Sequence, residues 1–230
     1  MHIAVGITTF NRPTMLERLI EDIERDAKGF DLTIKIIDDG SSETYSRVVE
    51  KCRKRNYAFI KQAHRGKRGY WKTVNTLYAQ FMSVKFDYYY SFPDDFRLAP
   101  NYFKRSIEYW NTIEDASLIG LNTMNTGRVN PGWTHFQPEE RIYGGVLFTK
   151  NQWLDCHLMC TPKYFNVMRW RVPNADKWRA GSSGVGALTS KYLHKFGHSM
   201  YVCPNLIAHG DHESVMHPDE RKRNPLVSKF

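Results

Sequence analysis

The first half of the chain alternates strand-like and helix-like segments, and this alternation restricts the fold more than any other feature. Apolar and β-branched runs predict strands at residues 2–8, 32–37, 57–62 and 86–92. Apolar residues at helical spacing predict helices at 14–29, 43–55, 70–82 and 100–113. Thr14 and Gly29 are the expected ends of the first helix, and Ser41 or Ser42 the expected cap of the second. Such alternation is typical of an α/β fold, a parallel sheet with helices on both faces.

Polar stretches follow each of these predicted strands. They are "TTFN", "DDGSS", "HRGKRG" and "PDD". Because ligands of parallel α/β sheets bind beyond the carboxyl ends of the strands, we expect these stretches to converge on one crevice. The adjacent acids Asp94 and Asp95 are notable because like charges repel, and burying either one requires a cation or a hydrogen-bond donor. The alternative is an ordinary turn in solvent.

The second half is less regular. Strands are expected at 117–122, 144–149 and 199–203, a helix at about 186–195, and a long loop at 125–140. There is no repeat and no low-complexity linker. We therefore predict one domain over residues 1–212, with halves at about 1–110 and 111–212, followed by a polar tail at 213–230.

Composition limits the cellular setting and the partners. Of the 230 residues, 41% are hydrophobic, which is enough for a packed core, yet no apolar run is long enough to span a bilayer. The N-terminus lacks a signal-length apolar region, so we expect a soluble, cytoplasmic protein, in the host cytoplasm if it is viral. The formal net charge of +9 suits a polyanionic partner without choosing among nucleic acid, an anionic surface and a phosphorylated substrate.

Five motifs together resemble a known family. "ITTFNRP", "IIDDGSS", "RGKRGYWKTVN", "PDDFRLAP" and "CPNLIAHGDH" are similar, in order and approximate spacing, to motifs of GT-A-fold glycosyltransferases, especially the family 2-like group. The resemblance covers about residues 3–212. It implies a Rossmann-like, mostly parallel twisted sheet flanked by helices, with a nucleotide-sugar half and an acceptor half. It also implies transfer of a sugar from a nucleotide sugar, with UDP-sugars favoured, to a hydroxyl acceptor with help from Mn²⁺ or Mg²⁺.

The resemblance assigns roles to individual positions. The nucleoside-binding edge comprises Thr8, Thr9, Phe10 and Arg12. The acids that receive base and ribose are Asp38 and Asp39, and the cations near base or phosphate are Lys67 and Arg68. The metal ligands are Asp95 and His209, with Asp94 as a substitute ligand. A cation at such a site neutralises the departing diphosphate, and Mg²⁺ and Mn²⁺ favour carboxylate oxygens.

Two departures from the family pattern matter. Members commonly carry Asp-x-Asp at the metal motif, but here Pro93 stands at the first acid position and cannot bind a metal. In addition, "GSSGVGAL" holds no acid where inverting members place the general base. Asp176 is the nearest upstream acid and the first substitute, with Asp155 and Asp211 in reserve. A retaining mechanism needs no such base, so the stereochemistry stays open.

The acceptor and two other function classes also stay open. Cations and tryptophans interleave at 169–171 and 177–179, a pattern that suits nucleic acid, although tryptophans also stack on sugars and pack cores. Two classes of acceptor are therefore considered. One is nucleic acid, for example a flipped hydroxymethylated base in phage-type DNA, and the other is a glycan or glycoconjugate. The alternatives to a glycosyltransferase are a nucleotidyltransferase-like nucleotide-binding enzyme and a non-catalytic nucleic-acid-binding protein.

Overall fold

The first half of the molecule has the predicted alternation. The computed structural model describes residues 1–124, 138–150, 157–178 and 183–209. Its first elements are β1 (His2–Thr9), α1 (Pro13–Asp26), β2 (Asp31–Asp38), α2 (Ser46–Arg55), β3 (Ala58–Lys61), α3 (Gly66–Ala79) and β4 (Tyr88–Pro93). Each predicted strand and helix of this half is therefore present, although several boundaries move.

The remaining elements begin with a short strand and the last helix predicted for the first half, and they include several further short strands. They are β5 (Phe96–Leu98), α4 (Tyr102–Thr112), β6 (Leu118–Asn122), β7 (Glu139–Tyr143), β8 (Val146–Lys150), β9 (Leu158–Cys160), α5 (Pro162–Met168), α6 (Val185–Lys195), β10 (Ser199–Val202) and β11 (Ile207–His209). The sequence did not predict β5, β7, β9, β11 or α5, because three to seven residues are too few to show a hydrophobic period. The expected loop at 125–140 lies partly outside the described residues, and its last two residues belong to β7.

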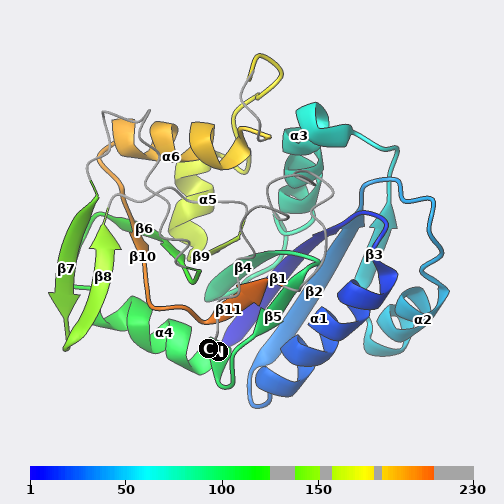
Figure 1. Cartoon of the computed structure of the whole chain (residues 1–230), viewed down its shortest axis with the longest axis horizontal. Helices are drawn as coiled ribbons and strands as arrows, with labels where there is room; N and C mark the ends of the chain where they lie inside the picture. Colours follow the sequence, from blue (N-terminus) through cyan, green and yellow to red (C-terminus); the bar gives the residue numbers. More distant parts are fainter. Residues whose placement is uncertain (125–137, 151–156, 179–182, 210–230) are drawn as a thin grey trace.

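One mixed sheet organises the molecule. Its strand order is β3-β2-β1-β4-β9-β6-β10-β8-β7 (Figure 1). The β1–β2, β1–β4, β2–β3 and β6–β10 pairs are parallel. β9 runs antiparallel between β4 and β6, and the β7–β8 hairpin joins β10 in antiparallel fashion. The prediction of a mostly parallel α/β sheet is confirmed.

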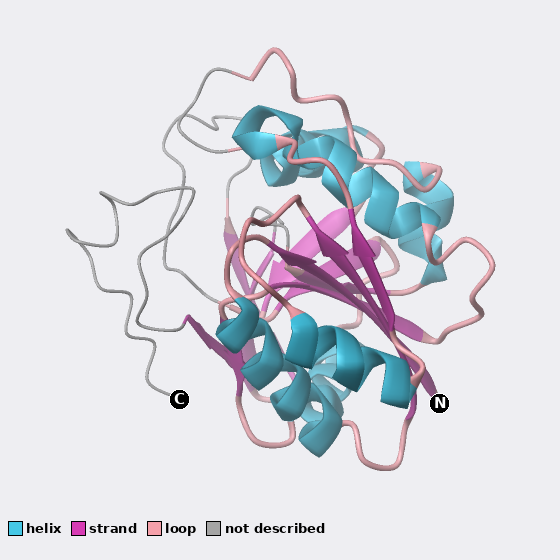
Figure 2. Cartoon of the chain, turned by 90° about the vertical axis from the view of Figure 1, so that its right-hand side faces the viewer, coloured by secondary structure: helices cyan, strands magenta, loops and turns pink. Residues whose placement is uncertain are grey.

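Helices cover both faces of this sheet, giving three layers (Figure 2). Side chains of α1, α2 and α4 pack in one hydrophobic cluster, and side chains of α3, α5 and α6 pack in the other. Ile3, Val5 and Ile7 of β1 belong to the first cluster and Ala4 to the second, as the two-residue period of a strand requires. Because β1 contributes to both clusters, it is buried along almost its whole length.

Three helix starts differ from the sequence expectation. α1 begins at Pro13 with Arg12 in the cap position, and it ends at Asp26, before Gly29. α2 begins only at Ser46, because Ser41 and Ser42 are engaged by Asp38 and Asn11 and cap no helix. α3 begins at Gly66, four residues early, so Lys67 and Arg68 lie in its first turn.

Across the described ranges, no helix has both the length and the apolar character needed to cross a bilayer. The predicted tail at 213–230 lies outside the described residues. The division into two functional halves stays a prediction.

Candidate functional site

The turns after β1, β2 and β4 meet at one edge of the sheet. The β1–β2 register pairs Thr9 with Asp38, and the β1–β4 register pairs Thr8 with Pro93. The three strands are parallel and end level with one another, so the chain segments that follow them leave the sheet together. The convergence of "TTFN", "DDGSS" and "PDD" that the sequence predicted is therefore present.

The acid pair after β4 is buried, which excludes the solvated turn. Asp94 and Asp95 are 4% and 6% exposed. Thr9 Oγ1 and the Phe10 amide donate to Asp94 Oδ2 over 2.7 and 3.2 Å. Arg12 Nη1 lies 3.2 Å from Asp94 Oδ1 and 3.0 Å from Asp95 Oδ2.

Arg12 compensates this acid pair only in part. Burial and the neighbouring Asp95 raise the pKa of Asp94 to about 6, against the opposing effect of Arg12. One guanidinium faces two carboxylates, so the three groups carry a net charge of −1 when both acids are ionised. The site keeps a preference for positive charge.

Asp38 anchors the turn that follows β2. Its Oδ1 accepts hydrogen bonds from the Ser41 amide at 2.9 Å and the Ser41 hydroxyl at 2.5 Å. Its Oδ2 is buried and has no hydrogen-bond partner among the described residues. Asn11 ties this turn to the end of β1, because its amide donates to Ser41 Oγ and its side-chain oxygen accepts from the Ser42 amide. The carboxylate of Asp38 is thus held rigidly with one oxygen available as an acceptor.

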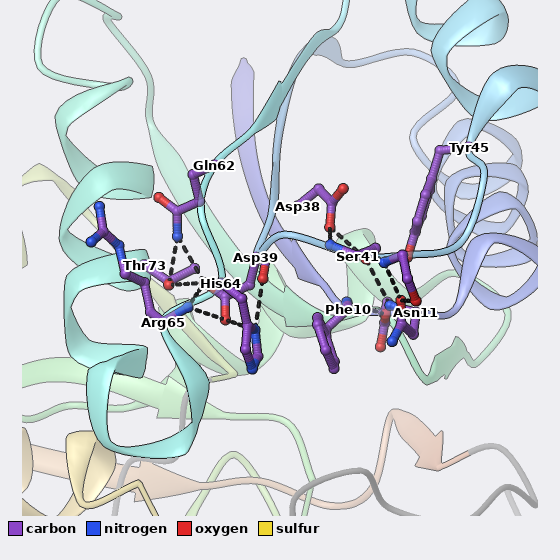
Figure 3. A network of polar contacts seen from close by, with 12 residues as sticks. Phe10, Asn11, Asp38, Asp39, Ser41, Tyr45, Gln62, His64, Arg65 and Thr73 are labelled. Atoms are coloured by element: carbon purple, nitrogen blue, oxygen red, sulfur yellow. Dashed lines mark hydrogen bonds and ion pairs between the residues drawn. The ribbon is translucent and has the colours of Figure 1, made fainter.

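Asp39 faces the loop that follows β3 (Figure 3). Its Oδ1 accepts from Thr73 Oγ1 at 2.6 Å and Gln62 Nε2 at 2.9 Å, and the Arg65 amide reaches both of its oxygens. Gly40 makes this approach possible, since a Cβ there would lie 2.4 Å from the His64 amide nitrogen. The two acids of "DDGSS" therefore sit in different surroundings: Asp39 is surrounded by donors, whereas Asp38 is not.

An aromatic pair lies beside these acids. The Phe10 and His64 rings stack with centroids 4.3 Å apart and planes 19° apart, and both rings project in the same direction (Figure 3). His64 Nδ1 donates to the Asp39 carbonyl over 2.8 Å, which fixes the ring. About half of the His64 side chain is exposed. The pair presents a flat apolar surface next to buried carboxylates.

Sequence reasoning did not single out Tyr45, although it is central to the site. Its buried hydroxyl accepts from the Arg12 amide at 2.8 Å and lies 2.8 Å from Thr9 Oγ1. His64, Gln62 and Thr73 were likewise not singled out as site residues. Only the position of His64 in "HRGKRG" offered a signal, because the other three residues fall inside segments that the sequence predicts as ordinary helices or strands.

Helix α3 links the strand ends to the second half of the chain. The Tyr70 hydroxyl lies 2.8 Å from Thr8 Oγ1, and the adjacent Trp71 donates from Nε1 to Asp176 Oδ1 over 2.8 Å. Asp176 is exposed, and the Trp71 hydrogen bond lowers its pKa. Asp176 is therefore close to the helix that flanks the site and is ionised at neutral pH. The other two candidate bases, Asp155 and Asp211, lie outside the described residues.

The backbone also brings His209 next to the acid pair. β11 pairs antiparallel with β5, and the register sets His209 opposite Phe96, the residue directly after Asp95. More than a hundred residues separate these positions in the chain, so the strand pairing alone makes them neighbours.

The donor chemistry of the acid pair fits a divalent cation. Asp94 Oδ1 and Asp95 Oδ2 converge on a single nitrogen of Arg12, the kind of position that a shared cation would take. Across the described ranges, no cluster of three or more His, Cys, Asp or Glu side chains suitable for a metal is present. Pro93 contributes no ligand, so a cation here would have two carboxylates and take its other ligands from phosphate and water, as Mg²⁺ commonly does.

Comparison with known proteins adds a family and a fold. The profile of the family described as "Glycosyl transferase family 2" matches residues 4–172. A search of curated protein sequences gave no match.

Several solved structures share the fold. S. aureus TarS 1–349 in complex with UDP-GlcNAc superposes with a TM-score of 0.60 at 13% identity, over 93% of this chain and 60% of TarS 1–349. The mannosyltransferase PcManGT from Pyrobaculum calidifontis, with GDP-Man and Mn²⁺, superposes with a TM-score of 0.59 at 11% identity, over 89% of this chain and 55% of that protein. Glucosyl-3-phosphoglycerate synthase from Mycobacterium tuberculosis, with Mn²⁺, UDP and glucosyl-3-phosphoglycerate, superposes with a TM-score of 0.54 at 16% identity, over 90% of this chain and 71% of the synthase.

This chain therefore spans less than two thirds of TarS 1–349 and of the mannosyltransferase. At such identities the likeness establishes the fold, and the site has to be interpreted from its own residues.

Proposed function

The chain belongs to glycosyl transferase family 2, and we propose that it transfers a sugar from a nucleotide-sugar donor to a hydroxyl acceptor. The observation that carries the proposal is the convergence of three strand-end turns on one edge of the sheet. There they gather a buried acid pair, a second acid turn and an exposed aromatic surface.

We propose that the nucleoside binds along the turns after β1 and β2. Phe10 and His64 offer a flat surface for a base. Asp38 Oδ2, a buried acceptor without a partner among the described residues, suits a ribose hydroxyl. Asp39 supports this surface by holding the loop of His64, because its oxygens already accept several hydrogen bonds. Lys67 and Arg68, at the start of α3, are candidates to face the phosphates.

We propose UDP-sugars as the first donors to test. Two of the three similar structures contain UDP or UDP-GlcNAc and the third GDP-Man, so the comparison supports a nucleotide sugar in general. Mn²⁺ or Mg²⁺ would be held by Asp95 and Asp94, with His209 as a further candidate. When bound, such a cation neutralises the charge that develops on the diphosphate leaving group.

We propose that the acceptor hydroxyl belongs to nucleic acid, such as a hydroxymethylated base, or to a glycan or glycoconjugate. The net charge of +9 favours an anionic acceptor. Asp176 is our candidate general base. Its lowered pKa keeps it ionised, and the Trp71 hydrogen bond fixes its position. Asp176→Asn should then slow transfer by about 10²-fold, within the usual range for general-base catalysis. It should leave donor binding unchanged.

The test is a panel of UDP-glucose, UDP-GlcNAc and GDP-mannose, each with and without Mn²⁺. A donor that binds the native state should raise the melting temperature, and slow hydrolysis of the same donor should release the nucleoside diphosphate. Asp95→Asn should slow this release by about 10²–10³-fold. If no donor shifts the melting temperature or is hydrolysed by the wild type, the proposed function is wrong. Pyrophosphate release from a nucleoside triphosphate would instead support a nucleotidyltransferase.

A further inference from the structure

One side chain, Arg12, holds both acids of the candidate metal motif. A single nitrogen, Nη1, lies 3.2 Å from Asp94 Oδ1 and 3.0 Å from Asp95 Oδ2. The three side chains are largely buried, with exposed fractions of 12% for Arg12 and 5% for each acid. Among the described residues, the guanidinium of Arg12 is thus a cation that contacts both acids at once.

The position of Arg12 is fixed by the fold. Its amide donates to the Tyr45 hydroxyl, and the residue occupies the cap position of α1, immediately before Pro13. Pro13 has a restricted φ and also limits the conformation of the residue before it. The backbone of Arg12 is therefore held in place, and its side chain can move away from the two acids without a change in β1 or α1.

A divalent cation and the guanidinium cannot occupy the same place. A metal held by both Asp94 Oδ1 and Asp95 Oδ2 would compete for the same two oxygens that Nη1 now contacts. Like positive charges also repel strongly in a buried site. Either the side chain of Arg12 leaves or the cation does not bind to both acids.

We propose that Arg12 is a built-in competitor for the divalent cation, so that metal binding displaces its side chain and Arg12 sets the metal affinity of the acid pair. The proposal rests on the proposed function only for the identity of the cation. It concerns binding, which can be measured without a sugar donor.

The acids carry a net charge of −2 without Arg12 and share a net charge of −1 with it. Replacing Arg12 by a neutral side chain of similar length therefore increases the attraction for a divalent cation and removes the need to break two charged contacts. The measured effect should be at least about a tenfold tighter binding of Mn²⁺.

The test is a titration of Mn²⁺ followed by the electron paramagnetic resonance signal of the free ion, with purified wild type, Arg12→Met and Arg97→Met. It is run without donor, at about pH 8. Arg97→Met is the matched control: Arg97 is only two residues after Asp95, but its guanidinium pairs with the buried Asp22 on α1. Arg12→Met should bind Mn²⁺ at least tenfold more tightly than the wild type, Arg97→Met should match the wild type, and Arg12→Met/Asp95→Asn should lose the gain.

Equal Mn²⁺ affinities in wild type and Arg12→Met would overturn the proposal, as would an equal gain in Arg97→Met. If Arg12→Met does not fold, side-chain NMR of the wild type decides. The Arg12 Nε–H resonance should shift when Mg²⁺ is added and the Arg97 resonance should not, whereas an unmoved Arg12 resonance contradicts displacement. Donor hydrolysis is scored separately, so a gain in Mn²⁺ binding without turnover of any donor would reject only the proposed function.

Discussion

Two clusters of polar side chains, one built around the pair Asp94 and Asp95 and the other around Asp115, lie at opposite ends of the same sheet and differ in how their carboxylates are compensated. Asp94 and Asp95 follow the carboxyl end of β4, share one guanidinium and repel each other. Asp115 precedes the amino end of β6 and is a lone acid. It accepts from Lys150 Nζ at 2.8 Å, the Tyr201 hydroxyl at 2.6 Å and both the amide and hydroxyl of Ser117.

The two pKa values move in opposite directions. Burial raises the pKa of Asp115, but its hydrogen bonds outweigh burial and hold the pKa well below its usual range. For Asp94, burial and the neighbouring acid prevail, and the pKa rises to about 6. A carboxylate surrounded by hydrogen-bond donors stabilises the fold. A buried pair of carboxylates with too little positive charge around it lowers the stability of the fold and is suited to bind a positively charged ligand.

The largest expected difference between the clusters is in catalysis. Asp95→Asn should lower the rate of donor turnover by about 10²–10³-fold, the usual loss when one electrostatic contact to the developing charge is removed. Asp115→Asn should leave the rate per folded molecule within about twofold, because its cluster lies at the other end of the sheet. Initial rates with saturating donor and metal measure both. Comparable losses in the two variants would remove the distinction.

The pH dependence of stability should also have opposite signs. The folded-state pKa of Asp94 is raised, so the folded state binds this proton more tightly, and ionisation of Asp94 destabilises the fold as pH rises from about 4 to 6. The shift from 3.8 to about 6 corresponds to about 3 kcal/mol at neutral pH. Asp94→Asn, which mimics the protonated acid, should therefore be more stable than the wild type at pH 7 and similar at pH 4.

Asp115 has a lowered pKa, so its ionised form stabilises the fold. This stabilisation is present above about pH 4 and is lost as pH falls further. Urea unfolding of the wild type, Asp94→Asn and Asp115→Asn across this pH range measures how the free energy of unfolding changes with pH for each acid. The same sign of slope for both variants would contradict the assignment of one cluster to ligand binding and the other to stability.

Asp115→Asn should lower the free energy of unfolding at pH 7 by about 2 kcal/mol, because charged hydrogen bonds from Lys150 and Tyr201 are weakened in a mostly buried place. Lys150→Met is a useful companion, since it removes one donor and leaves Ser117 and Tyr201 in place. Its loss should be no larger than that of Asp115→Asn. Chemical denaturation measures both, and unchanged midpoints would show that the cluster has no stabilising role.

The smallest expected effect concerns Asp176, an exposed acid that accepts a hydrogen bond from Trp71. Trp71→Phe keeps an aromatic ring and removes the donor, and it should leave the free energy of unfolding nearly unchanged, because the carboxylate of Asp176 is exposed to solvent. The pKa of Asp176 should rise, which is measurable by NMR titration of the carboxyl carbon. An unchanged pKa would show that the hydrogen bond is absent in solution.

The alternation of elements and the position of the polar turns could be predicted from the sequence. Ile3, Val5 and Ile7 have the strand period, and Leu16, Leu19 and Ile20 have the helix period, so local pattern is enough to assign each segment. The parallel order then places Asp38 and Asp94 at the same edge of the sheet. The family also follows from motifs that are local in the chain.

The sequence could not predict the partners of the site residues. Arg12 was assigned to the nucleoside edge, yet it binds the acid pair, and Tyr45 and His64 received no specific role. No predicted site role is tested by the structure. Until a donor complex tests them, predictions remain for Thr8, Thr9, Phe10, Arg12, Asp38, Asp39, Lys67, Arg68, Asp94, Asp95, Asp155, Asp176, His209 and Asp211.

The sequence by itself determined the type of each long element, the fold class and the edge of the sheet at which polar groups gather, because these depend on residues close together in the chain. Only the tertiary structure decided that one guanidinium bridges Asp94 and Asp95, and that β11 brings His209 opposite Phe96. Such contacts join segments some eighty to more than a hundred residues apart. They depend on strand register and on which charges must be compensated once buried, and no local pattern in the sequence records either.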